Sequence, residues 1–332
     1  MTTTLATEET RVATITTGLD RLRRSLHTGS RIAAPYRAAS EPAWHSSYVA
    51  PAAERPPVAA RMASFGYGES ELHGRADLAD DLAMTGPVRL LTPDGAAALR
   101  GICQNLEASA VHNDYVVSRR LRGVEALSPF VHAMVRDPVY LDTVSRLVGV
   151  PLIPHPLRDA GVQINYYEAA ADASRAPLVA KWHLDGMNYV FTMTLSDHAE
   201  HQGGDYIYYR GHPRDFEARR EEITDQGPRH PDVHIAPFQH VGDTMFTRGS
   251  RVYHAVTPVT RGRRITLAVS LFCPLLGDQD ENRFWHSAPD DGLVRTLNNW
   301  NALRRAVRRP ASYCRREDIP IRPLARRSAA RG

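Results

Sequence analysis

The sequence predicts a mainly β fold with flanking helices, whose core is a double-stranded β-helix of the jelly-roll or cupin-like type. Short segments that alternate apolar and polar residues dominate positions 151–274, as expected for strands with two different faces. Helical patterns lie before residue 149 and after residue 291. The expected strand at 161–167 has one polar face, which suits a sheet that encloses a polar site.

Length and composition are those of a globular protein. The 332 residues, 42% hydrophobic and 23% charged, can bury a large core. No apolar run approaches the length of a membrane-spanning helix, and the first residues lack the basic and apolar regions of a secretory signal. Three widely separated cysteines argue against a disulfide framework. We therefore expect a cytoplasmic protein with no membrane partner.

Charge and composition divide the chain into three parts. Residues 1–65 read as an extended arm rich in Ala and Pro, 66–310 as a single domain, and 311–332 as a basic tail. From residue 303 onward the sequence has ten arginines and two acidic residues, so this end carries a charge of about +8. The net charge of the whole chain is +4, so the remainder carries about −4. Aromatic residues are sparse there, so a nucleic acid partner is not expected.

The first half of the chain predicts mainly helices. Thr92 and Asp137 are the expected N-caps of two of them, and Gly149 lies just past the end of the second. The expected elements are helices at 14–26, 76–84, 93–108 and 138–147 and a strand at 87–91.

Strands follow in the second half. The expected strands are 161–167, 189–196, 206–209, 242–246, 250–256 and 265–272, with a tight turn at Gly203 and Gly204. Residues 210–237 are charged and polar, with a helix at 214–224, and read as an insertion between strands. A last helix is expected at 291–307.

The segment from Lys181 to Gly186 carries the clearest chemical signal. In a β-strand His183 and Asp185 project to the same side, so both can bind one metal ion. A distant strand offers His254 as a third ligand. Two histidines and one carboxylate leave other metal positions open, and this ligand set suits non-haem Fe(II).

Ten residues after His254, the run from Arg264 to Leu271 alternates between two faces. Arg264, Thr266 and Ser270 share the small, polar face, whereas the other face is entirely aliphatic. A guanidinium and a hydroxyl two residues apart can hold a carboxylate through charge-assisted hydrogen bonds. Arg263 would face the opposite way, as a surface charge.

Together, the His-x-Asp motif, the distal histidine and the Arg-x-Thr motif resemble the Fe(II)/2-oxoglutarate-dependent dioxygenases, over about 161–274. The resemblance implies that His183, Asp185 and His254 bind Fe(II), and that Arg264 with Thr266 or Ser270 binds the far carboxylate of 2-oxoglutarate. It further implies that Asn165 and Tyr167 contact cosubstrate or substrate, that O2 takes the last metal position, and that 210–237 is a lid.

The same resemblance implies the kind of reaction. A small molecule, of amino-acid or natural-product origin, would be hydroxylated, desaturated or cyclised, with release of succinate and CO2. Asp185 occupies the position where related halogenases have Gly or Ala, which favours hydroxylation. Three alternatives stay open: a cupin-like metal enzyme that does not use 2-oxoglutarate, a macromolecule hydroxylase or demethylase that uses the basic tail, and a binding module without activity.

The remaining polar and aromatic residues give weaker indications of function. His198, His201, His230, His234 and His240 are expected on the surface. The tyrosines at 206–209 suit sheet packing, with Tyr208 or Arg210 as candidates for substrate contact. Strict alternation would also place Lys181 on the side of His183.

Overall fold

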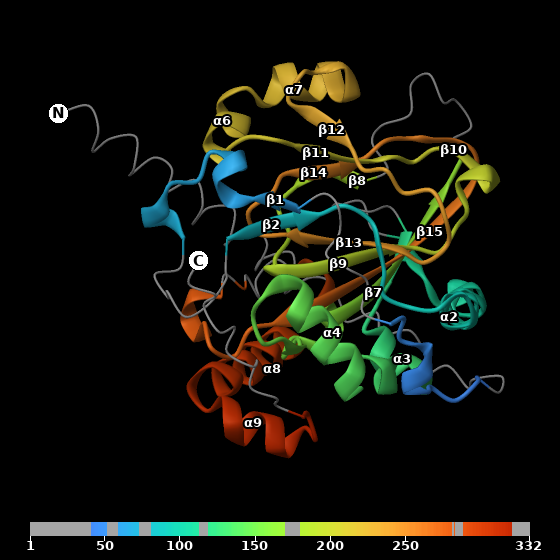
Figure 1. The fold of residues 1–332 in the computed structure, drawn as a ribbon, viewed down its shortest axis with the longest axis vertical. Coiled ribbons are helices and arrows are strands. Elements are labelled where there is room, and N and C mark those ends of the chain that lie inside the picture. The colour runs from blue at the N-terminus through green and yellow to red at the C-terminus, as the bar shows by residue number, and fades with distance from the viewer. Residues whose placement is uncertain are drawn as a thin grey trace, which may run out of the picture.

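The computed structural model describes residues 41–51, 59–72, 81–112, 119–169, 180–280, 282 and 288–320. The helix expected at 14–26 lies outside these residues. Two antiparallel sheets form the centre of the molecule (Figure 1). The predicted sheet-rich fold with flanking helices is confirmed.

The larger sheet has the strand order β1-β2-β13-β9-β15-β7-β5-β4, with β3, β6 and β10 paired at its sides. Its strands are β1 (Ala59–Arg61), β2 (Leu82–Thr85), β3 (Val88–Arg89), β4 (Val111–His112), β5 (Arg119–Arg122), β6 (Ile153–Pro154), β7 (Val162–Glu168), β9 (Tyr189–Thr194), β10 (His201–Gly203), β13 (Asp243–Arg248) and β15 (Val259–Phe272). The smaller sheet has the order β12-β11-β14-β8, formed by β8 (Ala180–His183), β11 (Tyr206–Tyr209), β12 (Val233–Ile235) and β14 (His254–Val256).

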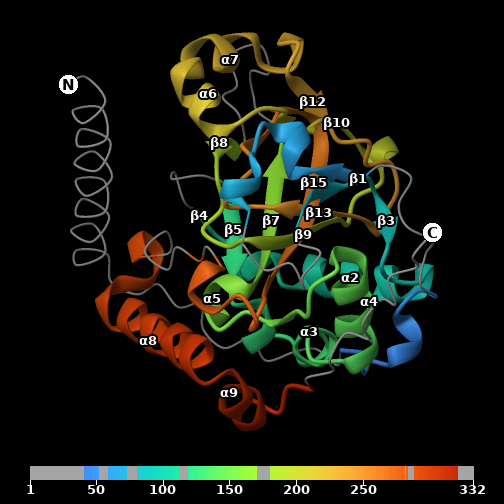
Figure 2. The ribbon, with the colours of Figure 1, turned by 60° about the vertical axis from the view of Figure 1, so that its left-hand side comes forward.

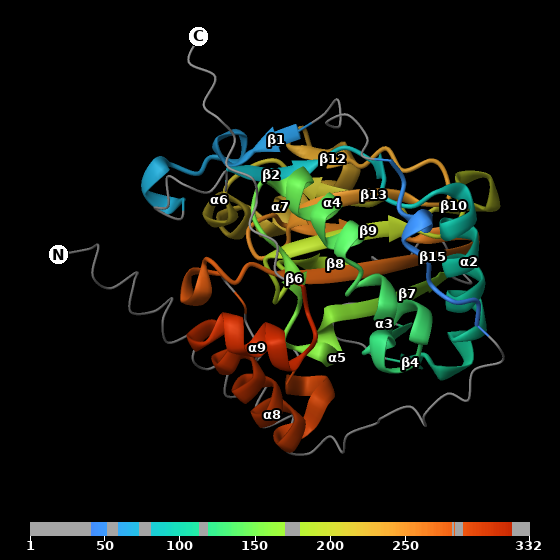
Figure 3. The same cartoon turned by 60° about the horizontal axis from the view of Figure 1, so that its bottom comes forward.

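Helices cover the outer faces of both sheets (Figures 2 and 3). Beside the larger sheet lie α2 (Pro93–Asn105), α3 (Pro129–Met134), α4 (Pro138–Val148), α5 (Arg158–Gly161), α8 (Ala288–Arg308) and α9 (Pro310–Arg316). Over the smaller sheet lie α6 (Pro213–Ala218) and α7 (Arg220–Gln226). Single 3-10 turns are η1 (Ser46–Tyr48), η2 (Met62–Phe65), η3 (Glu69–Glu71), η4 (Glu107–Ser109), η5 (Val124–Ala126), η6 (His198–Glu200), η7 (Gly227–Arg229) and η8 (Gly277–Gln279).

The helix ends follow the capping residues. The Thr92 hydroxyl accepts from the backbone N–H of Gly95, and the Asp137 carboxylate caps α4 through two backbone N–H groups. Gly149 ends α4 in the left-handed conformation, at φ 91°. Among the described residues, no helix is both long and apolar enough to cross a membrane.

Three apolar layers result from the alternation along the strands. Ile164 and Leu267 pack with the helices of the larger sheet, and Tyr167 and Tyr206 meet between the two sheets. A third cluster, which includes Trp182, packs the smaller sheet against α6 and α7. These two helices therefore cover an outer face, and the lid role expected for the insertion 210–237 does not fit them.

The described ends of the chain are packed against the core. Met62 and Phe65 are fully buried between the sheets, and Tyr313 and Cys314 of α9 are buried as well. Two secondary-structure predictions were wrong in part. Of the strand expected at 250–256, only 254–256 form one. Residues 82–84, expected in a helix, lie in strand β2. Pairing of β2 with β1 and β13 buries Ala83 and Met84, and this long-range contact outweighs the local helical pattern.

Candidate metal centre

Strand pairing brings the three predicted metal ligands together. β14 pairs with β8 so that His254 lies directly opposite His183, and their ring centroids are 4.3 Å apart. One Asp185 oxygen lies 3.4 Å from Nε2 of His183, and the other lies 3.5 Å from Nε2 of His254. Ligand atoms of all three residues fall within 4.8 Å of one another, as a shared metal ion requires.

Backbone hydrogen bonds orient both imidazoles. Nδ1–H of His183 donates to the carbonyl of Lys181 at 2.6 Å, and Nδ1–H of His254 donates to the carbonyl of Val252 at 2.9 Å. In the neutral form of each imidazole, Nε2 therefore carries the lone pair, and it faces Asp185. The Asp185 carboxylate outweighs burial and raises the pKa of His254. Burial and the neighbouring His254 lower the pKa of His183, which favours the neutral imidazole that binds metals.

The Asp185 carboxylate can lie between the two histidines because Gly249 has no side chain. The backbone N–H of Asp185 donates to the carbonyl of Gly249 at 2.7 Å. A Cβ at residue 249 would lie 2.4 Å from Oδ2 of Asp185 and 2.8 Å from the carbonyl oxygen of Met187. No sequence pattern predicts this requirement, since the two residues are far apart in the chain and meet only in the folded protein.

The strand that carries His183 departs from strict alternation. His254 pairs with His183, but Val256 pairs with Ala180, so β8 has one residue more than β14 over this stretch. The bulge leaves the Lys181 side chain exposed. Because of the bulge, alternation along β8 does not place the Lys181 side chain beside His183.

A second polar group lies between the sheets at Arg264, which is only 2% exposed. Arg264 pairs with Tyr167 across β15 and β7, and Thr266 pairs with Asn165. Nη1 of Arg264, Oγ1 of Thr266 and Oδ1 of Asn165 are buried without a hydrogen-bond partner among the described residues. The buried Tyr167 hydroxyl lies beside Thr266 and Asn165, so Nη1 of Arg264 is the atom that most needs a further partner. Because an unpaired buried polar atom is costly, this guanidinium favours a polar ligand beside it.

Ser270 does not join this group. It lies six residues beyond Arg264 on the continuous strand β15, which corresponds to about 20 Å along the strand. Of the two predicted partners for Arg264, Thr266 is therefore the nearer, at only about 7 Å along the strand. Arg263 lies on the exposed side and pairs with Glu107, as expected.

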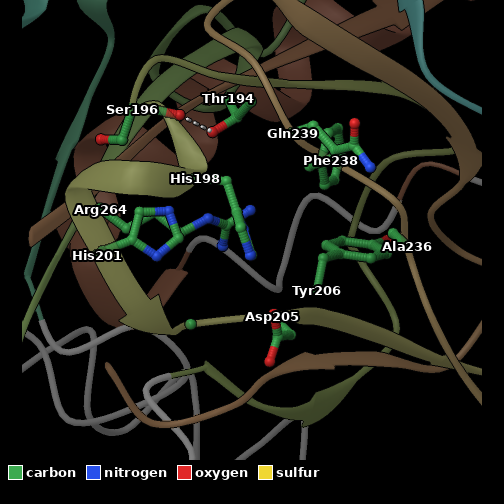
Figure 4. Close-up of a pocket in the computed structure, with 11 residues that line it drawn as sticks. Thr194, Ser196, His198, His201, Asp205, Tyr206, Ala236, Phe238, Gln239 and Arg264 are labelled. Carbon is green, nitrogen blue, oxygen red and sulfur yellow. Dashed lines mark hydrogen bonds between the residues drawn. The ribbon is translucent and has the colours of Figure 1, made fainter. Parts of the chain in front are cut away.

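A pocket opens beside Arg264 (Figure 4). His198 and His201 lie with Arg264 on one side of this pocket, and Tyr206 and Phe238 lie on the other. Gly204 allows the close approach, since a Cβ there would lie 3.2 Å from Cδ of Arg264.

Some residues in and near this region differ from the sequence-based expectation. His201 and His230, expected on the surface, are buried. His201 donates from Nδ1 to the carbonyl of Gly203 at 2.9 Å. Tyr206, expected only to pack in the sheet, stacks on the ring of His254 with centroids 5.3 Å apart. Its strand position was predicted, but its contact depends on the pairing of β11 with β14.

No protein-family model and no curated protein matches the chain. Solved structures similar to it include HygX from Streptomyces hygroscopicus with nickel and 2-oxoglutarate bound, at 16% identity and TM-score 0.41, over 62% of this chain and 87% of that one. The non-heme alpha ketoglutarate dependent epimerase SnoN from nogalamycin biosynthesis is 15% identical, with TM-score 0.41, over 57% and 77%. EctD from S. alaskensis with bound Fe is 16% identical, with TM-score 0.41, over 57% and 73%. This likeness is remote.

Proposed function

We propose that the chain is an Fe(II)- and 2-oxoglutarate-dependent oxygenase that hydroxylates, desaturates or cyclises a small molecule. The proposal is supported by two groups of side chains on the inner side of the two sheets. One is a complete set of two histidines and one carboxylate. The other, on the facing sheet, is a buried arginine with unpartnered polar neighbours. We infer a double-stranded β-helix core within a single domain at 66–310.

His183, Asp185 and His254 would hold the iron. Two neutral imidazole nitrogens and one carboxylate suit Fe(II), and three ligands leave room for further ones. His183 and Asp185 are 20% and 23% exposed, whereas the His254 side chain is 8% exposed, so the site is open on one side. Bound Fe(II) with 2-oxoglutarate and O2 supplies oxidative decarboxylation to succinate and CO2, coupled to oxidation of a C–H bond.

Arg264 and Thr266 would bind the far carboxylate of 2-oxoglutarate. Burial lowers the pKa of Arg264, so an anionic partner would stabilise its charged form. The unpartnered Nη1 can donate to one carboxylate oxygen, and the Thr266 hydroxyl can donate to the other. The Asn165 oxygen can only accept, so its partner would be a donor such as a water molecule or a substrate hydroxyl.

Anaerobic titration with Fe(II), with and without 2-oxoglutarate, tests both sites together. Chelation of the keto acid to Fe(II) should give a visible charge-transfer absorbance in the wild type. His183→Ala should abolish the absorbance by removing an iron ligand. Arg264→Ala should raise the 2-oxoglutarate concentration that is needed by about 10-fold or more, since a charge-assisted hydrogen bond contributes about 1.5–3 kcal/mol.

Arg263→Ala is the matched control. It removes the same charge from the neighbouring position on the exposed side of β15, so the 2-oxoglutarate requirement should stay at the wild-type value. If iron binds but no keto-acid absorbance develops, the chain is a metal enzyme that does not use 2-oxoglutarate. If no iron binds, His183, Asp185 and His254 are not its ligands.

A further inference from the structure

The register of the smaller sheet places two further side chains in line with the metal ligands. His234 pairs with Tyr208, Tyr208 with His254, and His254 with His183. Directly opposed residues on neighbouring antiparallel strands have Cβ atoms about 5 Å apart. Tyr208 is therefore an immediate neighbour of a proposed iron ligand, and His234 lies about 10 Å from that ligand.

Tyr208 and His234 lie on the inner face of this sheet. Tyr206, two residues from Tyr208 on the same strand, stacks on His254, whereas Ile207 and Tyr209 belong to the outer cluster under α6 and α7. The Tyr208 and His234 rings are stacked, with centroids 5.6 Å apart and an interplanar angle of 21°. Both residues are only partly buried, so aromatic surface stays accessible beside the metal centre.

Arg210 adds a positive charge to the same stretch. It directly follows β11, two residues beyond Tyr208, which corresponds to about 7 Å of strand. Because side chains alternate between the two faces of a strand, Arg210 continues the face of Tyr206 and Tyr208, at the exposed end of β11. In the described part of the chain the exposed Arg210 guanidinium has no carboxylate partner, unlike Arg219 and Arg220, which pair with Glu222 and Glu217.

We propose that Tyr208, His234 and Arg210 form the substrate-binding surface, and that the substrate is a ring-bearing carboxylate. Its ring would pack against Tyr208 and His234, and its carboxylate would pair with Arg210, whose planar guanidinium suits two parallel hydrogen bonds. The inference rests on the proposed function, because the oxidised carbon must lie beside the metal held by His183, Asp185 and His254.

Binding of three probes to the Fe(II)- and 2-oxoglutarate-loaded protein tests this inference. Calorimetry without oxygen would compare 3-phenylpropanoate, which has ring and charge, with 3-phenylpropanol, which has only the ring, and butanoate, which has only the charge. Saturating 2-oxoglutarate keeps these acids from Arg264. The wild type should bind 3-phenylpropanoate at least tenfold more tightly than either partial probe.

Two variants separate the contributions. Arg210→Gln should weaken 3-phenylpropanoate about tenfold or more and leave the alcohol unchanged. Tyr208→Leu should weaken the two aryl probes and spare butanoate. If Tyr208→Leu disturbs the iron ligands, His234→Leu replaces it, because His234 lies one strand further from the metal. His234→Leu should likewise weaken the two aryl probes and spare butanoate. Arg261→Gln, an exposed arginine on β15, is the matched control and should bind as the wild type does.

The outcomes distinguish this inference from the proposed function. Wild-type keto-acid absorbance without any preference for 3-phenylpropanoate would overturn the substrate surface and leave the oxygenase assignment intact. Equal losses in Arg210→Gln and Arg261→Gln would also overturn it. Absence of the absorbance in the wild type would contradict the proposed function itself.

Discussion

At the scale of single residues, the position of Asp185 depends on a glycine that has no chemistry of its own. Gly249 follows the buried strand β13, and its carbonyl accepts from the backbone N–H of Asp185. The side chain of any other residue would occupy the space of the Asp185 carboxylate. The proposed metal site therefore depends on a fourth position besides its three proposed ligands.

Gly249→Ala should accordingly weaken metal binding. The added Cβ would lie 2.4 Å from a carboxylate oxygen and 2.8 Å from a backbone carbonyl oxygen, so Asp185 must move. Loss of one well-placed ligand or its orientation should lower Fe(II) affinity by about 10–100-fold. Equilibrium dialysis of Fe(II) under anaerobic conditions measures this change.

Gly101→Ala is the control for the same added methyl group. Gly101 lies inside α2 with no atom within 4 Å of the added Cβ, and alanine favours a helix by about 1 kcal/mol over glycine. Fe(II) affinity should be unchanged there, with equal or higher stability. Wild-type affinity in Gly249→Ala would show that Asp185 is not a metal ligand.

Residue patterns predicted which side chains share a face, but not which distant segments meet. Alternation alone placed Arg264 with Thr266 and Asn165 with Tyr167, because the faces of a strand follow from its period of two. The clash at Gly249, the bulge at Lys181 and the row from His183 to His234 depend on strand register, which long-range contacts determine.

At the scale of elements, a buried polar network ties together the segments around the metal site. Asn188, in the loop between β8 and β9, donates to Asp280 at 2.8 Å and accepts from Nε of Arg248 at 2.7 Å. Asp280 also accepts from the backbone N–H of Cys273 at 2.9 Å. The loop that carries Asp185 is thus joined to the end of β13 and to the segment after β15.

Asp280 should make stability depend on pH. Burial raises its pKa to about 6 from an ordinary 3.8, so the folded state holds this proton more tightly than the unfolded state does. Its contribution to stability is full below about pH 4 and is lost as the pH rises through about 6, a change of roughly 3 kcal/mol. Asp280→Asn cannot ionise, so urea unfolding should show the variant gaining stability relative to the wild type from pH 4 to pH 7.

Asp225→Asn, an exposed carboxylate on α7, is the control for removing one negative charge. The difference in unfolding free energy between wild type and Asp280→Asn is the quantity to compare. A difference that is constant from pH 4 to pH 7 would mean that Asp280 titrates alike in the folded and unfolded states, and would contradict the prediction.

At the scale of the whole molecule, the proposed metal and cosubstrate sites lie beside the apolar layer between the two sheets, and an N-terminal segment completes this layer. Met62 and Phe65 are fully buried in it with Tyr167 and Tyr206. Phe65 also approaches Tyr208, with ring centroids 6.3 Å apart. Part of the arm that the sequence predicted as an extended segment therefore belongs to the core.

Phe65→Ala should destabilise the whole molecule by about 3–5 kcal/mol, the usual effect of removing a fully buried phenylalanine. Urea unfolding of the metal-free protein measures this loss, and Val294→Ala, at a position 74% exposed on α8, should change the unfolding free energy by less than about 0.5 kcal/mol. The proposed metal ligands come from β8, β14 and the loop after β8, so the folded Phe65→Ala variant should still bind Fe(II). A loss comparable to that of Val294→Ala would show that Phe65 does not pack between the two sheets.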